Sequence, residues 1–283
     1  MAFSLTELEA RLSDPLILDS GAPLATDAQH VFDHAIALLE RGELRAARKD
    51  ADGTWHAVTW VKRAILLGFR LGKVVEMSAG GPFHFFDKHT FPTRDFRLEH
   101  QVRIVPGGST VRRGAYLAPS VVCMPPMYVN VGAWVGRGTM IDSHALVGSC
   151  AQIGERVHLS AAAQIGGVLE PVNASPVIIE DDVIVGGNCG VYEGTVVRAR
   201  AVLGAGVILT RGTPVYDLVR ETVHRGTPDL PLEIPEGAVV VPGARRVSSA
   251  FGEREGVSLQ TPVIVKYRDD RTDAATALEA WLR

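Results

Sequence analysis

The sequence predicts a mainly β protein built around a parallel β-helix, and three observations support this fold class. An apolar residue recurs at every sixth position from Val111 to Ile165, and again from Ile179 to Val215. The positions between are rich in Gly, Ala, Ser and Thr. A period of six fits neither a helix nor an alternating strand, whereas it is typical of a parallel β-helix.

The repeat places one inward-facing side chain in every sextet. These 17 positions are aliphatic except for one cysteine, and they are Val111, Leu117, Cys123, Val129, Val135, Ile141, Val147, Ile153, Leu159, Ile165, Ile179, Val185, Val191, Val197, Leu203, Leu209 and Val215. Three sextets make one coil of a triangular prism, which gives about five to six coils. Successive coils pair at the strand spacing of about 4.8 Å. Because no coil can bury its own apolar face, we expect stability to come from stacking.

The period is interrupted between Ile165 and Ile179 by a Pro-flanked segment, residues 168–176. We expect this segment to leave the prism wall, and loops extruded from such repeats often carry binding roles. The interval from Ile165 to Ile179 keeps phase with the sextets if eight residues are extruded, and also if two are. The sequence alone does not choose between these two registers.

Residues 1–108 are predicted to form a mostly helical N-terminal domain. Apolar spacing indicates helices at 27–40 and 60–71, followed by Gly42 and Gly72. Between them, a turn at residues 52–53 joins two short extended segments. Residues 80–91 are aromatic and irregular; we interpret them as a loop whose rings pack on the domain core, or else as a substrate or subunit contact. Residues 97–106 are predicted to enter the repeat as a strand.

The repeat itself is assigned to residues 109–216, and residues 217–283 are predicted to form a small β/α domain. Three prolines indicate a loop arm at 221–235. Strands are predicted at 238–241, closed by a turn at 242–243, and at 261–266. A helix is predicted at 273–282.

Composition places the chain among ordinary globular proteins. Of 283 residues, 46% are hydrophobic and 22% are charged, with a net charge of −3, which indicates neither a nucleic acid nor a membrane partner. The N-terminus has no basic segment followed by an apolar core, so we expect no signal peptide. All three cysteines fall in the repeat, and none forms a Cys-x-x-Cys pair. We therefore expect reduced thiols in a cytoplasmic protein, and no metal site.

One column of the repeat carries a candidate reactive group. Asp142 follows the inward-facing Ile141, and if eight residues are extruded the same column continues through Ser160, Gly186 and Gly204. A carboxylate then stands at the end of a track of small residues. Such a track exposes backbone donors and acceptors to a long, thin ligand, and a pantetheine arm has this shape.

Several motifs resemble one family of acyltransferases. The segments VGSCAQIG (147–154), IGGVLEP (165–171), VIIEDD (177–182) and GTMID (138–142), with the N-terminal piece 60–69, are similar to the tetrahydrodipicolinate N-succinyltransferases. The resemblance covers most of the chain and includes the interruption. It implies a left-handed parallel β-helix and a homotrimer with active sites between neighbouring prisms. It also implies transfer of succinyl from succinyl-CoA to the amino group of ring-opened tetrahydrodipicolinate, in lysine and diaminopimelate synthesis.

The resemblance also implies roles for individual residues. The family's substrate-contacting arginine falls on Arg103, and its catalytic or substrate-contacting aspartate falls on Asp142. A second acidic residue of many members falls on Gly190, and the nearest carboxylate in this chain is Glu193, which we take as the second catalytic candidate. A guanidinium suits an acceptor with carboxylates, and a carboxylate can take the proton of the attacking amine.

The remaining site residues follow the same track. We expect Ser160 to contact the acceptor. We expect the co-substrate succinyl-CoA to lie along Gly186, Gly204 and Ala205, with Lys266 reaching a CoA phosphate. No permanently bound cofactor is expected.

Two other functions stay open from the residues themselves. Another acyltransferase with the same repeat, using acetyl-CoA and a histidine base, would employ His144 or His158, since histidine is the commonest general base. A zinc hydratase of this fold would need about three histidine ligands, and since the repeat has only two, we do not expect this function. The other open possibility is a non-catalytic scaffold in which the prism serves only to assemble trimers.

Overall fold

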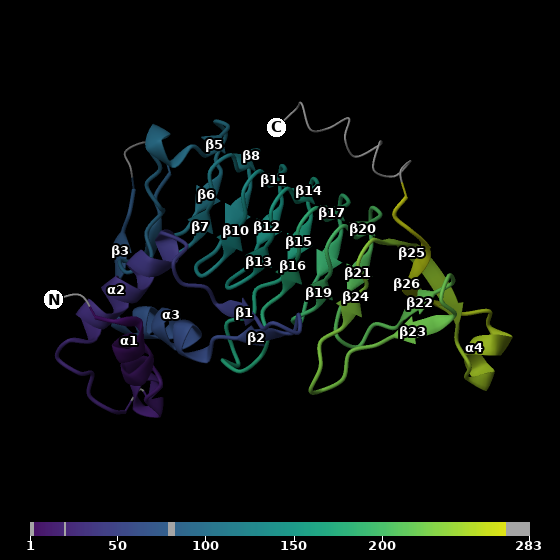
Figure 1. The fold of residues 1–283 in the computed structure, drawn as a ribbon, viewed down its shortest axis with the longest axis horizontal. Helices are drawn as coiled ribbons and strands as arrows, with labels where there is room; N and C mark the ends of the chain where they lie inside the picture. Colours follow the sequence, from purple (N-terminus) through teal and green to yellow (C-terminus); the bar gives the residue numbers. More distant parts are fainter. Residues whose placement is uncertain (1–2, 20, 79–82, 270–283) are drawn as a thin grey trace.

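The computed structural model describes residues 3–19, 21–78 and 83–269, and its centre is a prism of three parallel sheets (Figure 1). Most of its strands are very short, with two residues each. Sheet A contains β7 (Tyr116–Leu117), β10 (Trp134–Val135), β13 (Gln152–Ile153), β16 (Ile178–Ile179), β19 (Val196–Val197) and β24 (Glu233–Ile234). Sheet C contains β6 (Thr110–Val111), β9 (Tyr128–Val129), β12 (Leu146–Val147), β15 (Gln164–Ile165), β18 (Gly190–Val191) and β21 (Ile208–Leu209).

Sheet B is the longest of the three, because C-terminal strands extend it. It contains β5 (Arg103–Ile104), β8 (Val122–Cys123), β11 (Met140–Ile141), β14 (His158–Leu159), β17 (Ile184–Val185), β20 (Val202–Leu203), β25 (Ala238–Arg246), β26 (Ser258–Tyr267), β22 (Val215–Asp217) and β23 (Thr222–His224). Three parallel sheets of such short strands are typical of a left-handed parallel β-helix, as predicted.

Strand pairing confirms the register of the repeat and resolves the interruption. Before the interruption, each strand pairs with the strand three sextets later, as in Val135 with Ile153. Across it, Ile153 pairs with Ile179 and not with Pro171, the position three sextets later. Eight residues are therefore extruded, and the alternative of two is excluded. All 17 predicted inward positions are buried in one continuous core.

The N-terminal part packs its own apolar core against the first coils. It contains α1 (Leu5–Leu12), η1 (Pro15–Leu18), α2 (Ala28–Glu40), β1 (Ala47–Lys49), β2 (Trp55–Ala57), α3 (Thr59–Leu71), β3 (Val74–Glu76), β4 (Phe86–Lys88) and η2 (Leu98–His100). The helices α2 and α3 and the turn between β1 and β2 confirm the prediction. The α2–α3 contact is close because Gly68 has no side chain: a Cβ there would lie 2.2 Å from Phe32 Cε2.

Two predictions for this part were wrong. The aromatic segment is not a docked loop: β4 pairs with β3 in a hairpin, and Phe83, Phe85 and Phe86 are 72%, 59% and 65% exposed, whereas only Phe91 is buried. The expected strand at 97–106 is also mostly absent. Its first half is the 3-10 turn η2, and only Arg103–Ile104 pair with the repeat.

The C-terminal strands continue the prism. β24 pairs with β19, and β25 pairs with β20, both in parallel. The predicted turn at Pro242-Gly243 is wrong, because both residues lie inside β25 and pair with β26. A short helix, α4 (Ala250–Arg254), joins these two strands, and the predicted helix at 273–282 lies outside the described residues. The division of the chain at residues 108 and 216 stays a prediction, since strands on both sides of each boundary share a sheet.

In the described part of the chain, no helix combines the length and the apolar character that a membrane crossing needs.

Candidate functional site

Asp142 lies at the corner of the prism between sheets B and C, where β11 ends. Its backbone N–H donates to the carbonyl of Leu159 in the next coil, and its carboxylate Oδ1 accepts from the N–H of Ser143 at 2.8 Å. Its Oδ2 lies 3.8 Å from His158 Nε2. The side chain is 30% exposed, so the carboxylate is held on one side and accessible on the other.

The predicted track of small residues is present. Ser160, Gly186 and Gly204 donate their N–H groups in turn to the carbonyls of Val185, Leu203 and Val240. The glycines also allow close stacking: a Cβ at Gly186 would lie 2.6 Å from Leu203 O. The structure therefore brings Asp142, Ser160, Gly186 and Gly204 into one column, with Ala205 exposed beside it.

Arg103 and Lys266 both face outward on sheet B, Arg103 on the edge strand β5 and Lys266 on β26. Arg103 precedes Ile104, which pairs with the inward-facing Cys123, so its side chain faces outward. Within the described residues its guanidinium has no ion pair or hydrogen bond. Lys266 pairs with Val239 on β25 and contacts Asp269 at 3.6 Å on the surface. Two strand steps separate Arg103 from β11, about 10 Å, and five separate β11 from Lys266, about 24 Å.

Glu193 does not join Asp142 within one chain. It follows β18 and therefore lies at the corner between sheets C and A, whereas Asp142 lies between sheets B and C. Its carboxylate accepts a hydrogen bond from the N–H of Arg211 in the next coil at 3.0 Å. This bond gives Glu193 a structural role in the stacking of coils.

The position of the missing second acidic residue is covered by an aromatic ring. A Cβ built on Gly190 would lie 2.4 Å from Tyr192 Cε2 and 2.9 Å from its hydroxyl oxygen, and one on Gly166 would lie 2.8 Å from Tyr192 Cδ1. The phenol thus lies across two glycines on the outer face of sheet C. Sequence reasoning noted the departure at Gly190 but missed Tyr192, although a large residue two positions away was the available signal.

Sequence reasoning also missed that His158 stands beside Asp142. The three-sextet period could have predicted this, because it makes Met140 and His158 partners on β11 and β14, next to Asp142. The other repeat histidine, His144, is exposed in the turn after Asp142, with φ of 62°.

The three cysteines of the repeat are buried and unbridged. Burial raises the pKa of Cys123 and of Cys150 to about 12, although Lys62 opposes the rise at Cys150. These thiols are therefore packing groups, not nucleophiles. Among the described residues, no group of three or more His, Cys, Asp or Glu side chains is arranged to hold a metal ion.

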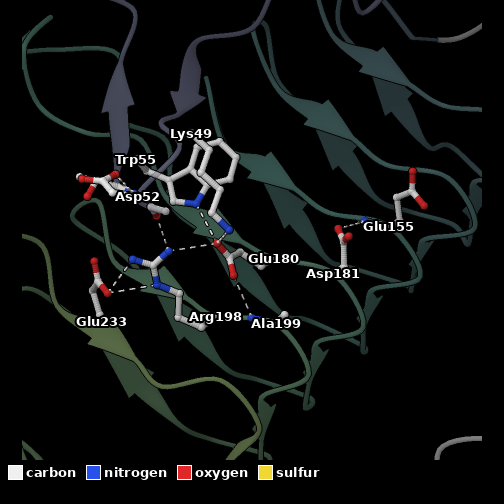
Figure 2. A network of polar contacts seen from close by, with 11 residues as sticks. Lys49, Asp52, Trp55, Glu155, Glu180, Asp181, Arg198, Ala199 and Glu233 are labelled. Atoms are coloured by element: carbon white, nitrogen blue, oxygen red, sulfur yellow. Dashed lines mark hydrogen bonds and ion pairs between the residues drawn. The ribbon is translucent and has the colours of Figure 1, made fainter.

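A separate polar network fixes the β1–β2 hairpin on sheet A (Figure 2). Glu180 accepts from the indole of Trp55 at 2.9 Å and from the N–H of Ala199 at 3.0 Å. It also pairs with Lys49 at 2.7 Å and Arg198 at 3.1 Å. Burial alone would raise the pKa of Glu180, but its hydrogen bonds to Lys49 and Trp55 and its ion pairing lower it overall. The carboxylate is therefore charged and saturated with donors.

Comparison with known proteins agrees with this architecture. Residues 19–71 match the model for the tetrahydrodipicolinate N-succinyltransferase N-terminal region, and residues 176–211 match the hexapeptide repeat of succinyltransferases. The 2,3,4,5-tetrahydropyridine-2,6-dicarboxylate N-succinyltransferase of Nitrobacter hamburgensis is 41% identical, over 99% of both chains. The protein of the same name from Polynucleobacter asymbioticus is 44% identical, over 91% of this chain and 90% of its own.

The prism, its small-residue track and the matching repeat define an acyltransferase of the hexapeptide-repeat class. Because the sequence identity extends over nearly the whole chain, it identifies the family as well as the fold. The chain belongs to the tetrahydrodipicolinate N-succinyltransferase family.

Proposed function

We propose that this protein transfers a succinyl group from succinyl-CoA to the amino group of ring-opened tetrahydrodipicolinate, a step in diaminopimelate and lysine synthesis. The observation that carries this proposal is the position of Asp142. It presents an accessible carboxylate at one end of the small-residue track, in a chain that matches the family over nearly its full length.

Arg103 and Asp142 are spaced to hold the two ends of the acceptor. The outward row of sheet B places Arg103 about 10 Å from the rung of Asp142. Since its guanidinium has no protein partner among the described residues, Arg103 can bind one acceptor carboxylate by two parallel hydrogen bonds. The acceptor amine then lies toward Asp142, and Ser160 is the next polar side chain along the track.

Asp142 serves as the base in the transfer. The amine attacks as a neutral group, its ammonium proton having passed to solvent. As the new C–N bond forms at the thioester carbonyl, Asp142 accepts the proton that leaves the nitrogen. The C–S bond breaks, and the CoA thiolate takes up a proton to leave as the thiol.

Succinyl-CoA lies along the track, and no permanent cofactor is needed. The backbone at Gly186, Gly204 and Ala205 offers hydrogen-bonding groups to a pantetheine arm. Lys266, about 24 Å from the rung of Asp142, is placed to meet a phosphate at the far end of an extended CoA. Buried thiols in the repeat suit a reducing cytoplasm.

A homotrimer would complete the site. Asp142 lies at the corner between sheets B and C, whereas Glu193 lies at the corner between sheets C and A, so a site that used both carboxylates would need a second chain alongside. Glu193 is then a weaker candidate for catalysis than Asp142, because its carboxylate is already engaged by Arg211 N–H.

The test is release of free CoA thiol when succinyl-CoA and the acceptor are mixed with wild type, Asp142→Asn and Glu193→Gln. We expect Asp142→Asn to lower kcat by roughly 10²–10⁴, with an intact fold and similar affinity for succinyl-CoA. Glu193→Gln should retain most of its kcat. Loss of turnover in Glu193→Gln with retention in Asp142→Asn would move the base to Glu193. No thiol release by wild type would favour the scaffold alternative.

A further inference from the structure

We propose that His158 is a positioning residue, which fixes the Asp142 carboxylate by donating a hydrogen bond from Nε2 to Oδ2 when the acceptor binds. The inference rests on the proposed function, because it assigns Asp142 the role of base. It adds a residue of the neighbouring coil to the catalytic apparatus without giving that residue a bond to the substrate.

The geometry places the two groups side by side on consecutive rungs. His158 is the outward residue of β14, directly above Met140 of β11, and Asp142 follows that strand. The Nε2–Oδ2 separation of 3.8 Å is longer than a hydrogen bond. Catalytic hydrogen bonds are often long in the absence of substrate and shorten in the complex. A small rotation of the carboxylate closes this gap.

The surroundings of the imidazole shield its Nε2 atom from water. The side chain is 13% exposed, and Nε2 itself is hidden from solvent. The strand partners of His158 on sheet B are Ile184 and Met140, both apolar. Because bulk water does not reach Nε2, it does not compete with Asp142 Oδ2 for this nitrogen, and a bond formed in such a shielded place is stronger than one in water.

The consequence concerns the direction in which Asp142 can accept a proton. One oxygen, Oδ1, is already tied to the N–H of Ser143. With Oδ2 held by His158 as well, each carboxylate oxygen has its own donor, which restricts rotation of the carboxylate. Fixing a reacting group in this way is worth a large factor in rate, since small displacements of a catalytic group can cost about 10²-fold.

The experiment compares kcat and both KM values for wild type, His158→Leu, His158→Gln, Asp142→Asn and the double variant Asp142→Asn/His158→Leu. We expect His158→Leu to lower kcat by about 10²-fold and to leave both KM values nearly unchanged. His158→Gln keeps an N–H donor and should recover most of the loss. In the Asp142→Asn background, His158→Leu should cost nothing further, because it acts through Asp142.

The matched control is His56→Leu. His56 also stands against an aspartate, Asp50, at 3.0 Å, but on the β1–β2 hairpin away from the track. It should keep the wild-type kcat. Should His158→Leu fail to fold, His158→Phe keeps a planar ring without the donor, and failure of both to fold would assign His158 to prism stability and overturn the proposal.

Two other results would also overturn it. One is full kcat in His158→Leu while Asp142→Asn is inactive, which would sink this inference and leave the proposed function standing. The other is an equal loss from His158→Leu in both backgrounds. Wild-type kcat in Asp142→Asn would instead reject Asp142 as the base, and this inference with it.

Discussion

At the scale of single residues, Arg103 gives a test of substrate binding that is separate from chemistry. Its guanidinium faces outward with no protein partner among the described residues, so removing it leaves no buried group unpaired. Arg103→Ala should raise the KM for the acceptor by roughly 30–160-fold, since a charge-assisted bidentate pair contributes about 2–3 kcal/mol. The KM for succinyl-CoA should change little. Steady-state kinetics with each substrate varied in turn provides the measurement, and equal effects on both would assign Arg103 a structural role.

Substitutions at Gly190 and Tyr192 should have coupled effects on stability, because the ring of Tyr192 occupies the space above Gly190. Gly190→Glu alone forces the phenol aside and should destabilise the fold by about 1–3 kcal/mol. Adding Tyr192→Val should recover part of this loss, a coupling of about 0.5–3 kcal/mol. Urea denaturation of the two single variants and the double variant measures it. Simple additivity of the two changes would show that Tyr192 does not cover this position in solution.

The sequence supplied the column of Asp142 but not the contacts of its members. A coil of three sextets fixes which residues stack, so Asp142 and Ser160 could be aligned in advance. Gly186 and Gly204 joined the column only on the assumption of eight extruded residues, which strand pairing then confirmed. The repeat does not fix side-chain rotamers. Two contacts depend on these rotamers. One is the packing of Tyr192 over Gly190, and the other is the hydrogen bond from Arg211 N–H to Glu193.

At the scale of elements, the short strand is the unit of stability, and its inward side chain stacks between its neighbours. Val135 is fully buried between Leu117 and Ile153 of sheet A. Val135→Asp should prevent folding of the prism, because an unpaired buried charge costs several kcal/mol. Ile208→Asp is the control, since Ile208 faces outward on β21 and is 37% exposed. Circular dichroism of the purified proteins distinguishes them, and a natively folded Val135→Asp would contradict the register.

Element prediction succeeded where periodicity was strong and failed where local residues were ambiguous. The helices α2 and α3 carried a clear apolar face and were found nearly to their ends. Pro242 and Gly243 usually mark a turn, but they lie in a strand here, because β25 and β26 pair along a long antiparallel ladder that overrides local preference. The β3–β4 hairpin was missed for a similar reason, since aromatic residues suggested burial and three of them are exposed.

At the scale of the whole molecule, the β1–β2 hairpin joins the helical part to the prism (Figures 1 and 2). Trp55 and Glu180 are 125 residues apart in sequence, and no periodic pattern relates them. Contacts of this kind depend on how two separately patterned parts meet, which explains why sequence reasoning found both parts and not the link.

The final prediction tests this link through Glu180, whose carboxylate contacts four donors, two from the hairpin and two from the next coil. Glu180→Gln should lower the free energy of unfolding at pH 7 by about 2 kcal/mol and speed amide exchange in β1 and β2. Because folding lowers the pKa of Glu180 below its usual 4.5, its contribution is complete above that pH and is lost as pH falls through the folded value. The stability gap between wild type and Glu180→Gln, measured by urea denaturation, should therefore narrow as pH drops below about 4.5. Glu155→Gln, which removes a surface pair with Arg156, should cost under about 1 kcal/mol. A gap for Glu180→Gln that stays constant down to acid pH, with unchanged exchange in the hairpin, would show that the charge of Glu180 does not hold the two parts together.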